Sequence, residues 1–293
     1  MTAAKIHRPL AAASAEPCPT CASPVATPYC ATCGEQRASD RHYTLGHLGA
    51  ELVETITHAD GRALRTVRAL VARPGELTAA YMRGARRPYL APLQFFFLVN
   101  IVFFLWVGIS HTNMFGTPLQ FHVQGAFYSD LAQRLVSARL AARHVTYDTY
   151  AAAFNHAAAL QSKSLIILMV PLLAVLAAII TLPVRRPATQ HVVFALHVMT
   201  AVLLLVIGLE CVLVVVQLML KAVGVHPRWQ VLDQTSAVLL VLVLGAYVHR
   251  ALRRAYQNTP AGATIRAVLF AVAFIPVIFL YRAVLFFTTF YTT

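Results

Sequence analysis

Five long apolar stretches constrain the fold of this chain more than any other feature of its sequence. They cover about residues 89–110, 164–184, 192–220, 231–248 and 265–287. A helix needs about 20 apolar residues to cross the hydrocarbon core of a bilayer, and it satisfies its own backbone hydrogen bonds there. The stretches predict an all-α integral membrane protein with about five transmembrane helices. Residues 89–287 would form the transmembrane bundle, with an extracytoplasmic loop at residues 110–163.

The composition agrees with lipid as the main solvent. Hydrophobic residues make up 58% of the chain and charged residues 12%, whereas a soluble domain typically carries about 25% charged residues. The net charge of +13 is compatible with nucleic acid or with anionic lipid as a partner. The position of the basic residues decides between these two partners.

The distribution of arginine and lysine predicts the orientation of the five spans. Seventeen of these residues lie on the side of the N-terminus and six on the opposite side, while Arg282 lies inside the last span. The positive-inside rule then places the N-terminus in the cytoplasm and the C-terminus outside. We therefore expect a bacterial cytoplasmic (inner) membrane protein that contacts membrane lipid. Nucleic acid is not expected as a partner, because topology accounts for the basic excess.

Two C-x-x-C pairs near the N-terminus indicate a metal site. Cys18 and Cys21 form the first pair, and Cys30 and Cys33 form the second. Four thiolates with this spacing suit a closed, structural Cys₄ zinc site, so residues 18–37 are predicted to be a small zinc knuckle. Two disulfides are the alternative, which an expected cytoplasmic location disfavours. Residues 1–17, before the knuckle, are predicted to be a disordered tail.

Residues 44–88 have the apolar spacing of amphipathic juxtamembrane helices. Arg62, Arg65 and Arg68 recur every three residues, and Arg86 and Arg87 directly precede the first span. Basic amphipathic helices commonly lie among lipid headgroups, so these five arginines are candidate headgroup contacts. The alternative is a helix packed beneath the bundle with a solvated arginine face, and the sequence leaves both readings open.

Several polar residues lie inside the predicted spans, where they are costly and usually face protein. Glu210 and Arg282 both lie about 26 Å from the inner edge of their spans at 1.5 Å per residue, which suggests an interhelical ion pair. Each could instead extend separately to the outer headgroups. Asn100 is placed to make an interhelical hydrogen bond. His191 and His197 could handle protons or a metal at the cytoplasmic end, or simply be satisfied interfacial histidines.

The order of several short motifs resembles a known family. The motifs include Cys33-Gly34-Glu35-Gln36-Arg37, Arg73-Pro74-Gly75, Gly84-x-Arg86-Arg87, Pro92-Leu93 and Gln161-Ser162-Lys163-Ser164. In combination they resemble the bacterial domain-of-unknown-function 3667 family, from Cys18 to the third span. The resemblance implies a multi-pass membrane protein with a cytoplasmic zinc knuckle, and it implies no particular activity.

The sequence contains no phosphate-binding loop, nucleophile elbow, zinc-protease motif or dinucleotide fingerprint. No catalytic residue is therefore assigned, and an enzymatic role is disfavoured without being decided. The favoured hypothesis is a scaffold or assembly factor whose zinc knuckle docks a cytoplasmic protein. The alternatives are a small-solute transporter or channel and a lipid-directed membrane enzyme.

Overall fold

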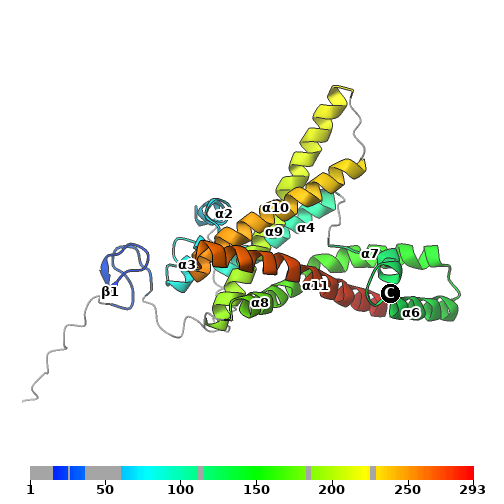
Figure 1. The fold of residues 1–293 in the computed structure, drawn as a ribbon, viewed down its shortest axis with the longest axis horizontal. Coiled ribbons are helices and arrows are strands. Elements are labelled where there is room, and N and C mark those ends of the chain that lie inside the picture. Colours follow the sequence, from blue (N-terminus) through cyan, green and yellow to red (C-terminus); the bar gives the residue numbers. More distant parts are fainter. Residues whose placement is uncertain (1–15, 26, 37–60, 111–114, 183–185, 225–228) are drawn as a thin grey trace, which may run out of the picture.

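The computed structural model describes residues 16–25, 27–36, 61–110, 115–182, 186–224 and 229–293, with the backbone alone for residues 229–237. In these ranges a two-stranded antiparallel hairpin precedes a series of helices (Figure 1). The predicted tail falls outside them, except that Glu16 and Pro17 form the first strand. Residues 44–60 of the predicted juxtamembrane segment also fall outside them. The elements are β1 (Glu16–Pro17), β2 (Pro24–Val25), α2 (Arg62–Ala72), α3 (Glu76–Met82), α4 (Pro92–Ser110), α5 (Leu119–Gln124), α6 (Ser129–Arg143), α7 (Tyr147–Leu165), α8 (Met169–Ile180), α9 (Ala188–Ala222), α10 (Trp229–Tyr256) and α11 (Pro260–Thr292).

The helices confirm the prediction of an all-α integral membrane protein. Within the described residues, four helical segments are long and apolar enough to cross a membrane, namely Pro92–Ser110, Tyr147–Ile180, Ala188–Ala222 and Pro260–Thr292. Their outward faces are apolar, and Ile101, Leu105 and Ile275 are each more than half exposed. Such exposure over several long helices fits contact with lipid rather than water. The predicted stretch 231–248 lies within α10.

The predicted second span is part of a longer helical run. Helices α7 and α8 are joined by a 3₁₀ turn at Ile166–Leu168, so that the chain is helical from Tyr147 to Ile180. Pro171 follows this turn by three residues and has no N–H to donate to the carbonyl of Ile167. A missing bond and a bulky ring favour a local departure from α-helical geometry.

Helix α9 is the centre of the bundle in its first half only. Its buried residues run from Thr189 to Val206, and this half packs against α4, α8, α10 and α3. Beyond Val206 its side chains are exposed or half-buried. Figure 1 shows the end of α9 and the start of α10 rising away from α11, which turns towards α7. The two halves of α9 therefore have different surroundings.

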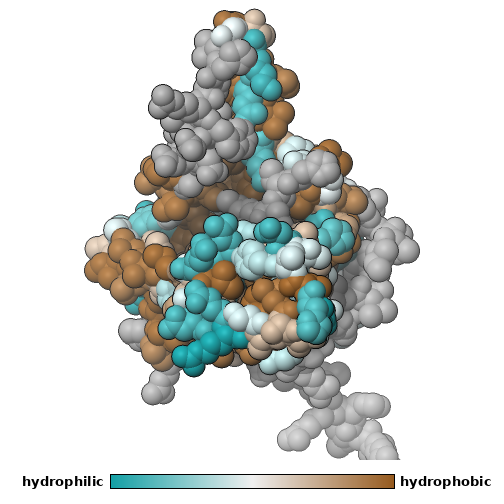
Figure 2. Space-filling view, turned by 90° about the vertical axis from the view of Figure 1, so that its right-hand side faces the viewer, coloured by the Kyte–Doolittle hydropathy of each residue, from teal (hydrophilic) through white to brown (hydrophobic). Residues whose placement is uncertain are grey.

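The predicted extracytoplasmic loop at residues 110–163 is largely helical, since it contains α5, α6 and most of α7. These helices share a second apolar core with the end of α11, in which Phe154, Phe286 and Phe290 are buried. This unit lies at the opposite end of the long axis of the molecule from the knuckle (Figure 1). Figure 2 views the molecule from this end and shows hydrophilic and hydrophobic patches interspersed over it.

A glycine turn joins α2 to α3 and sets α3 against α10. Gly75 adopts a φ of 83°, which glycine tolerates at no steric cost. A Cβ at this position would lie 2.5 Å from the carbonyl oxygen of Ala251 in α10. The Pro74-Gly75 motif is therefore required both by the turn and by the close approach of the two backbones.

Candidate metal centre and its docking turn

The two C-x-x-C segments form matching turns. In each turn the first cysteine donates its N–H to the carbonyl oxygen five residues ahead, at Ser23 and Glu35, with distances of 2.8 Å. The carbonyl oxygens of these cysteines accept N–H bonds from Ala22 at 2.9 Å and Gly34 at 2.7 Å. Both residues have positive φ values, of 61° and 69°. Glycine suits this conformation, whereas Ala22 adopts it at some cost in strain.

These turns bring four cysteine sulfurs together. The ligand atoms of Cys18, Cys21, Cys30 and Cys33 all lie within 4.8 Å of one another. The Sγ atoms of Cys18 and Cys33 are 3.5 Å apart, those of Cys21 and Cys30 are 3.6 Å apart, and all four residues are free cysteines. Sulfur atoms around a tetrahedral metal at about 2.3 Å are separated by about 3.8 Å. The four residues can therefore hold a metal ion, as the spacing predicted.

The protonation of one cysteine also suits metal binding. Hydrogen bonds with the side chain and backbone of Ser23 lower the pKa of Cys21 to about 6. At Cys33 a backbone hydrogen bond at Glu35 lowers the pKa, but burial and the neighbouring cysteine sulfurs raise it to about 12, so the four thiols do not ionise together without a metal. A bound cation would favour the thiolate, which is the form that binds metal.

A buried carboxylate fastens the metal centre to the turn that precedes the first span. Oε2 of Glu35, which is 5% exposed, accepts hydrogen bonds from the backbone N–H groups of Arg86 at 3.1 Å and Arg87 at 2.9 Å. It also accepts the hydroxyl of Thr20 at 2.6 Å. Bonds to a charged acceptor are roughly twice as strong as neutral ones. We call residues 84–87, which receive the knuckle, the docking turn.

The side chain of Arg87 also joins the docking turn to the knuckle. Nη1 of Arg87 donates to the carbonyl oxygen of Gly34 at 3.0 Å, and a Cβ on Gly34 would lie 2.4 Å from that nitrogen. The guanidinium of Arg86 packs over the ring of Tyr81 at 4.2 Å. Arg86 and Arg87, which were predicted as headgroup contacts, thus have roles in docking that local sequence patterns did not reveal.

The other predicted headgroup arginines lie on α2. Arg65 and Arg68 are exposed and Arg62 is partly exposed, and the same outward face carries Leu64 and Val71 at 75% and 60% exposure. The opposite face is fixed to the protein, partly because Oγ1 of the buried Thr66 accepts the N–H of Leu90 at 3.0 Å. An outward face of exposed aliphatic and basic residues is typical of interfacial helices.

The two predicted histidines join different helices and do not form a shared site. Nδ1 of His197 bonds with Oγ1 of Thr78 at 2.9 Å, which links α9 to α3. Nδ1 of His191 bonds with the hydroxyl of Tyr256 at 2.9 Å, and the two rings stack, which links α9 to α10. Both histidines are buried and have structural partners. Among the described residues, only the four cysteines form a group able to hold a metal ion.

The ion pair expected between Glu210 and Arg282 is not among those of the described residues. Glu210 accepts a hydrogen bond from the indole Nε1 of Trp106 in α4. Arg282 lies over the ring of Phe121 in α5 at 4.6 Å. The similar depth of Glu210 and Arg282 in the membrane did not predict either of these contacts. Helices α9 and α11 diverge beyond Val206, so the two side chains meet different neighbours. The amide oxygen of Asn100 also lacks the predicted interhelical bond within the described structure.

Comparisons with known proteins give one finding. A family model described as "Protein of unknown function (DUF3667)" matches residues 60–104, which include α2, α3, the docking turn and the start of α4. No curated protein and no solved structure matches the chain. The matched segment contains Arg65, Pro74, Gly75, Arg86 and Arg87, which carried the resemblance in the sequence. The segment that docks the candidate metal centre is thus similar to the DUF3667 family, in agreement with the resemblance seen in the sequence.

Proposed function

We propose that this protein is a membrane scaffold or assembly factor, whose zinc-bound knuckle presents a binding surface to a cytoplasmic protein. The observation that carries the proposal is the docking of the knuckle through Glu35. The knuckle is held on the docking turn by one face, while residues on its other loops are exposed to solvent. A rigid, exposed surface loses little entropy when it binds a partner.

Zinc is the metal that fits the centre best. Four cysteine thiolates leave no open coordination position, which is the arrangement of structural zinc sites. Within residues 16–25 and 27–36, only Cys18, Val25 and Cys30 form an apolar cluster, together with the partly buried Cys33. A cluster of this size cannot stabilise a fold alone, so metal binding would supply the free energy of folding.

The orientation in the proposal follows the basic residues. At the knuckle end, α3 packs directly on α10, where Arg83 and Arg254 both engage Glu76. Arg86 and Arg87 follow α3, and Arg250 and Arg253 precede Arg254 in the last turns of α10. Concentration of arginine at one end supports a cytoplasmic location for that end under the positive-inside rule. The C-terminus, at the other end in Figure 1, would then lie outside the bacterial inner membrane.

Tyr29 is the best candidate for a partner contact. Its side chain is 58% exposed, on the loop between the two cysteine pairs. Tyrosine is among the residue types that most often dominate binding energy at interfaces. The residue does not contribute a ligand to the metal, so its role in binding can be separated from its role in folding.

The test is quantitative cross-linking and affinity purification of the full-length protein from native membranes. We expect Tyr29→Ala to lose the cross-linked protein while retaining one zinc per chain, and Cys18→Ser to lose both. Tyr291→Ala, which removes a similarly exposed tyrosine at the other end of the molecule, is the matched control and should lose neither. Unchanged cross-linking in both knuckle variants would reject the docking function.

A separate measurement tests the orientation. Chelator-treated spheroplasts would be exposed to a membrane-impermeant maleimide, before and after permeabilisation. We expect the four knuckle cysteines to react only after permeabilisation. Reaction in sealed spheroplasts would place the knuckle outside the cytoplasm and contradict the proposed partner class.

A further inference from the structure

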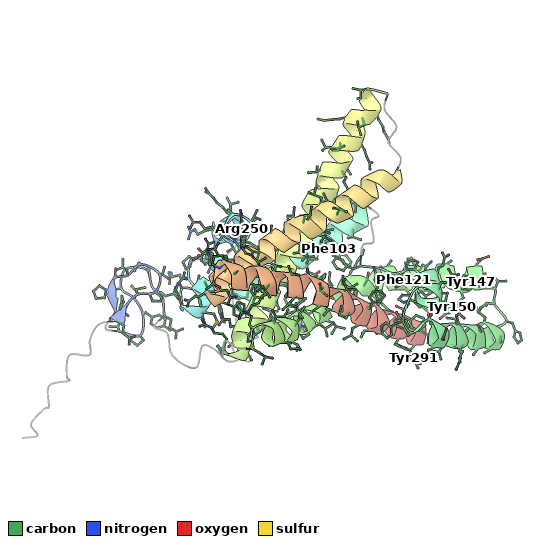
Figure 3. All side chains as sticks on the ribbon, viewed as in Figure 1. Phe103, Phe121, Tyr147, Tyr150, Arg250 and Tyr291 are labelled. Carbon is green, nitrogen blue, oxygen red and sulfur yellow. The ribbon has the colours of Figure 1, made fainter. Side chains whose placement is uncertain are left out.

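An apolar groove and a basic pocket adjoin at the knuckle end of the bundle. The groove has a volume of about 510 Å³ and lies between α9, α10 and the end of α2. The pocket has a volume of about 540 Å³ and is lined by Arg250, Arg253 and Arg254. Pro74 and Arg250 line both, so the two hollows lie next to each other. Figure 3 shows Arg250 beside α2.

The groove has the dimensions of one bilayer leaflet. On α9 its lining residues run from Ala201 to Val212, and on the antiparallel α10 from Arg250 back to Leu239. Each of these segments rises about 16 Å, at 1.5 Å per residue. The hydrocarbon core of one leaflet is about 15 Å thick, half of the bilayer value. An acyl chain that begins at Arg250 would therefore end near the middle of the membrane.

The walls of the groove are almost entirely aliphatic. Ala201, Gly208 and Val212 line it from α9, while Leu239 and Val243 line it from α10. Gly208 leaves the wall open, because a Cβ there would meet no atom within 4 Å. Such a surface offers a polar ligand no hydrogen bonds along most of its length, which favours a hydrocarbon chain.

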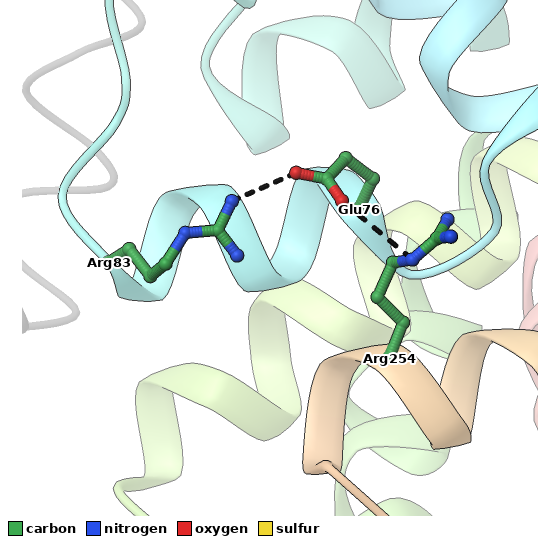
Figure 4. A network of polar contacts seen from close by, with 3 residues as sticks. All are labelled: Glu76, Arg83 and Arg254. Carbon is green, nitrogen blue, oxygen red and sulfur yellow. Dashed lines mark hydrogen bonds and ion pairs between the residues drawn. The ribbon is translucent and has the colours of Figure 1, made fainter. Parts of the chain in front are cut away.

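The basic pocket has charge available for an anion. Glu76 engages Arg254 at 3.7 Å and Arg83 at 2.9 Å, as Figure 4 shows. Arg250 and Arg253 have no carboxylate partner among the described residues, and both side chains are exposed. Two adjacent guanidinium groups with no balancing acid form a site for an anionic group such as a phosphate.

We propose that this combined hollow binds one anionic phospholipid, with its phosphate at Arg250 and Arg253 and an acyl chain in the groove between α9 and α10. Charge at the mouth, apolar walls and a leaflet-length groove together select this occupant. Free phosphate would use the pocket without the groove, and a neutral lipid would use the groove without the pocket. Basic pockets beside membrane helices are known to hold anionic headgroups. The site is independent of the proposed docking function, because it involves none of the knuckle residues.

The test is native mass spectrometry of the full-length protein, purified in detergent and titrated with phosphatidylglycerol. Phosphatidylcholine with the same chains probes the headgroup, and glycerol 3-phosphate probes the pocket without a chain. We expect one phosphatidylglycerol per chain to bind at least tenfold more tightly than phosphatidylcholine. Glycerol 3-phosphate at equal concentration should not displace it. Displacement would identify a free phosphate site and overturn the lipid assignment.

Two pairs of variants locate the lipid. The double variant Arg250→Gln/Arg253→Gln should weaken phosphatidylglycerol binding roughly thirtyfold, because each of the two arginines contributes separately to binding of the anionic headgroup. Arg134→Gln with Arg143→Gln removes the same charge from exposed positions on α6, outside both hollows, and should leave the affinity within about threefold. Equal losses in the two double variants would show diffuse electrostatic attraction and reject the site.

Filling the groove with a larger side chain tests whether the acyl chain of the lipid lies there. Gly208→Leu adds a side chain to the groove wall where no atom obstructs it, so the fold should be retained while phosphatidylglycerol binding falls at least tenfold. Gly108→Leu on α4 is the matched control, because Gly108 is equally unobstructed and lies outside the groove. Wild-type affinity in the Gly208→Leu protein would exclude the chain from the groove and overturn the proposal.

Discussion

Replacement of Glu35 by glutamine should release the knuckle from the docking turn without removing its metal. Three donors converge on Oε2 of Glu35, namely the hydroxyl of Thr20 and the N–H groups of Arg86 and Arg87. A neutral amide oxygen of the same shape can accept these bonds, but each loses the part that is due to charge. That loss is about 1 kcal/mol per bond. Only the bonds from Arg86 and Arg87 join the knuckle to the docking turn, since the Thr20 bond lies within the knuckle, so the docking loses about 2 kcal/mol.

Hydrogen exchange measures this loss directly. The backbone amides of Arg86 and Arg87 exchange with solvent when the knuckle leaves the turn, so a loss of about 2 kcal/mol should accelerate their exchange roughly 30-fold. Zinc content should stay at one per chain, because all four cysteines remain. Glu76→Gln is the matched control, since it removes a carboxylate from α3 that does not contact these amides.

Two results would refute this reasoning. Wild-type exchange rates for Arg86 and Arg87 in the Glu35→Gln protein would mean that the carboxylate does not hold the knuckle. Loss of zinc in this variant would mean that Glu35 supports the metal turns themselves rather than their docking.

Three further predictions concern the helices. Gly75→Ala should lower the free energy of unfolding by about 2 kcal/mol or more, because a Cβ in this conformation is strained and would press on α10; thermal unfolding in detergent measures it. Burial lowers the pKa of His122 to about 4, so between pH 6.5 and pH 4 the unfolded chain gains a proton that the folded protein does not. Stability should fall by about 3 kcal/mol over this range, and His122→Asn should flatten the pH profile. In double-mutant cycles, Trp106→Phe and Glu210→Gln should be coupled by about 1 kcal/mol or more, while Glu210→Gln and Arg282→Gln should be additive.

The sequence predicted the features that depend on local spacing. Among the described residues, four of the five apolar stretches lie in helices long and apolar enough to cross a membrane, and two C-x-x-C pairs form one four-cysteine group, because both signals act over a few neighbouring residues. By contrast, Glu35 is 51 residues from Arg86, and no local pattern indicates that its carboxylate would meet that backbone.

The prediction of a Glu210–Arg282 pair failed for a geometrical reason. Counting residues along two helices gives the depth of each side chain, but it gives neither the direction in which the side chain points nor the lateral separation of the helices. Helix α9 leaves the bundle beyond Val206, and α11 turns towards α7, so equal depth did not bring the two charges together. Glu210 instead accepts a hydrogen bond from the indole N–H of Trp106.

A continuous series of polar contacts connects the metal centre to the central helix. Glu35 holds the docking turn, which directly follows α3; Thr78 of α3 bonds to His197 of α9. Because α3 also packs closely on α10 at Gly75, the segment from α2 to the docking turn contacts the knuckle, one end of the apolar groove and the buried half of α9. The DUF3667 match covers this segment rather than the spans as a whole. The part of the chain that matches the family model is therefore the part that joins the four-cysteine knuckle to the helical bundle.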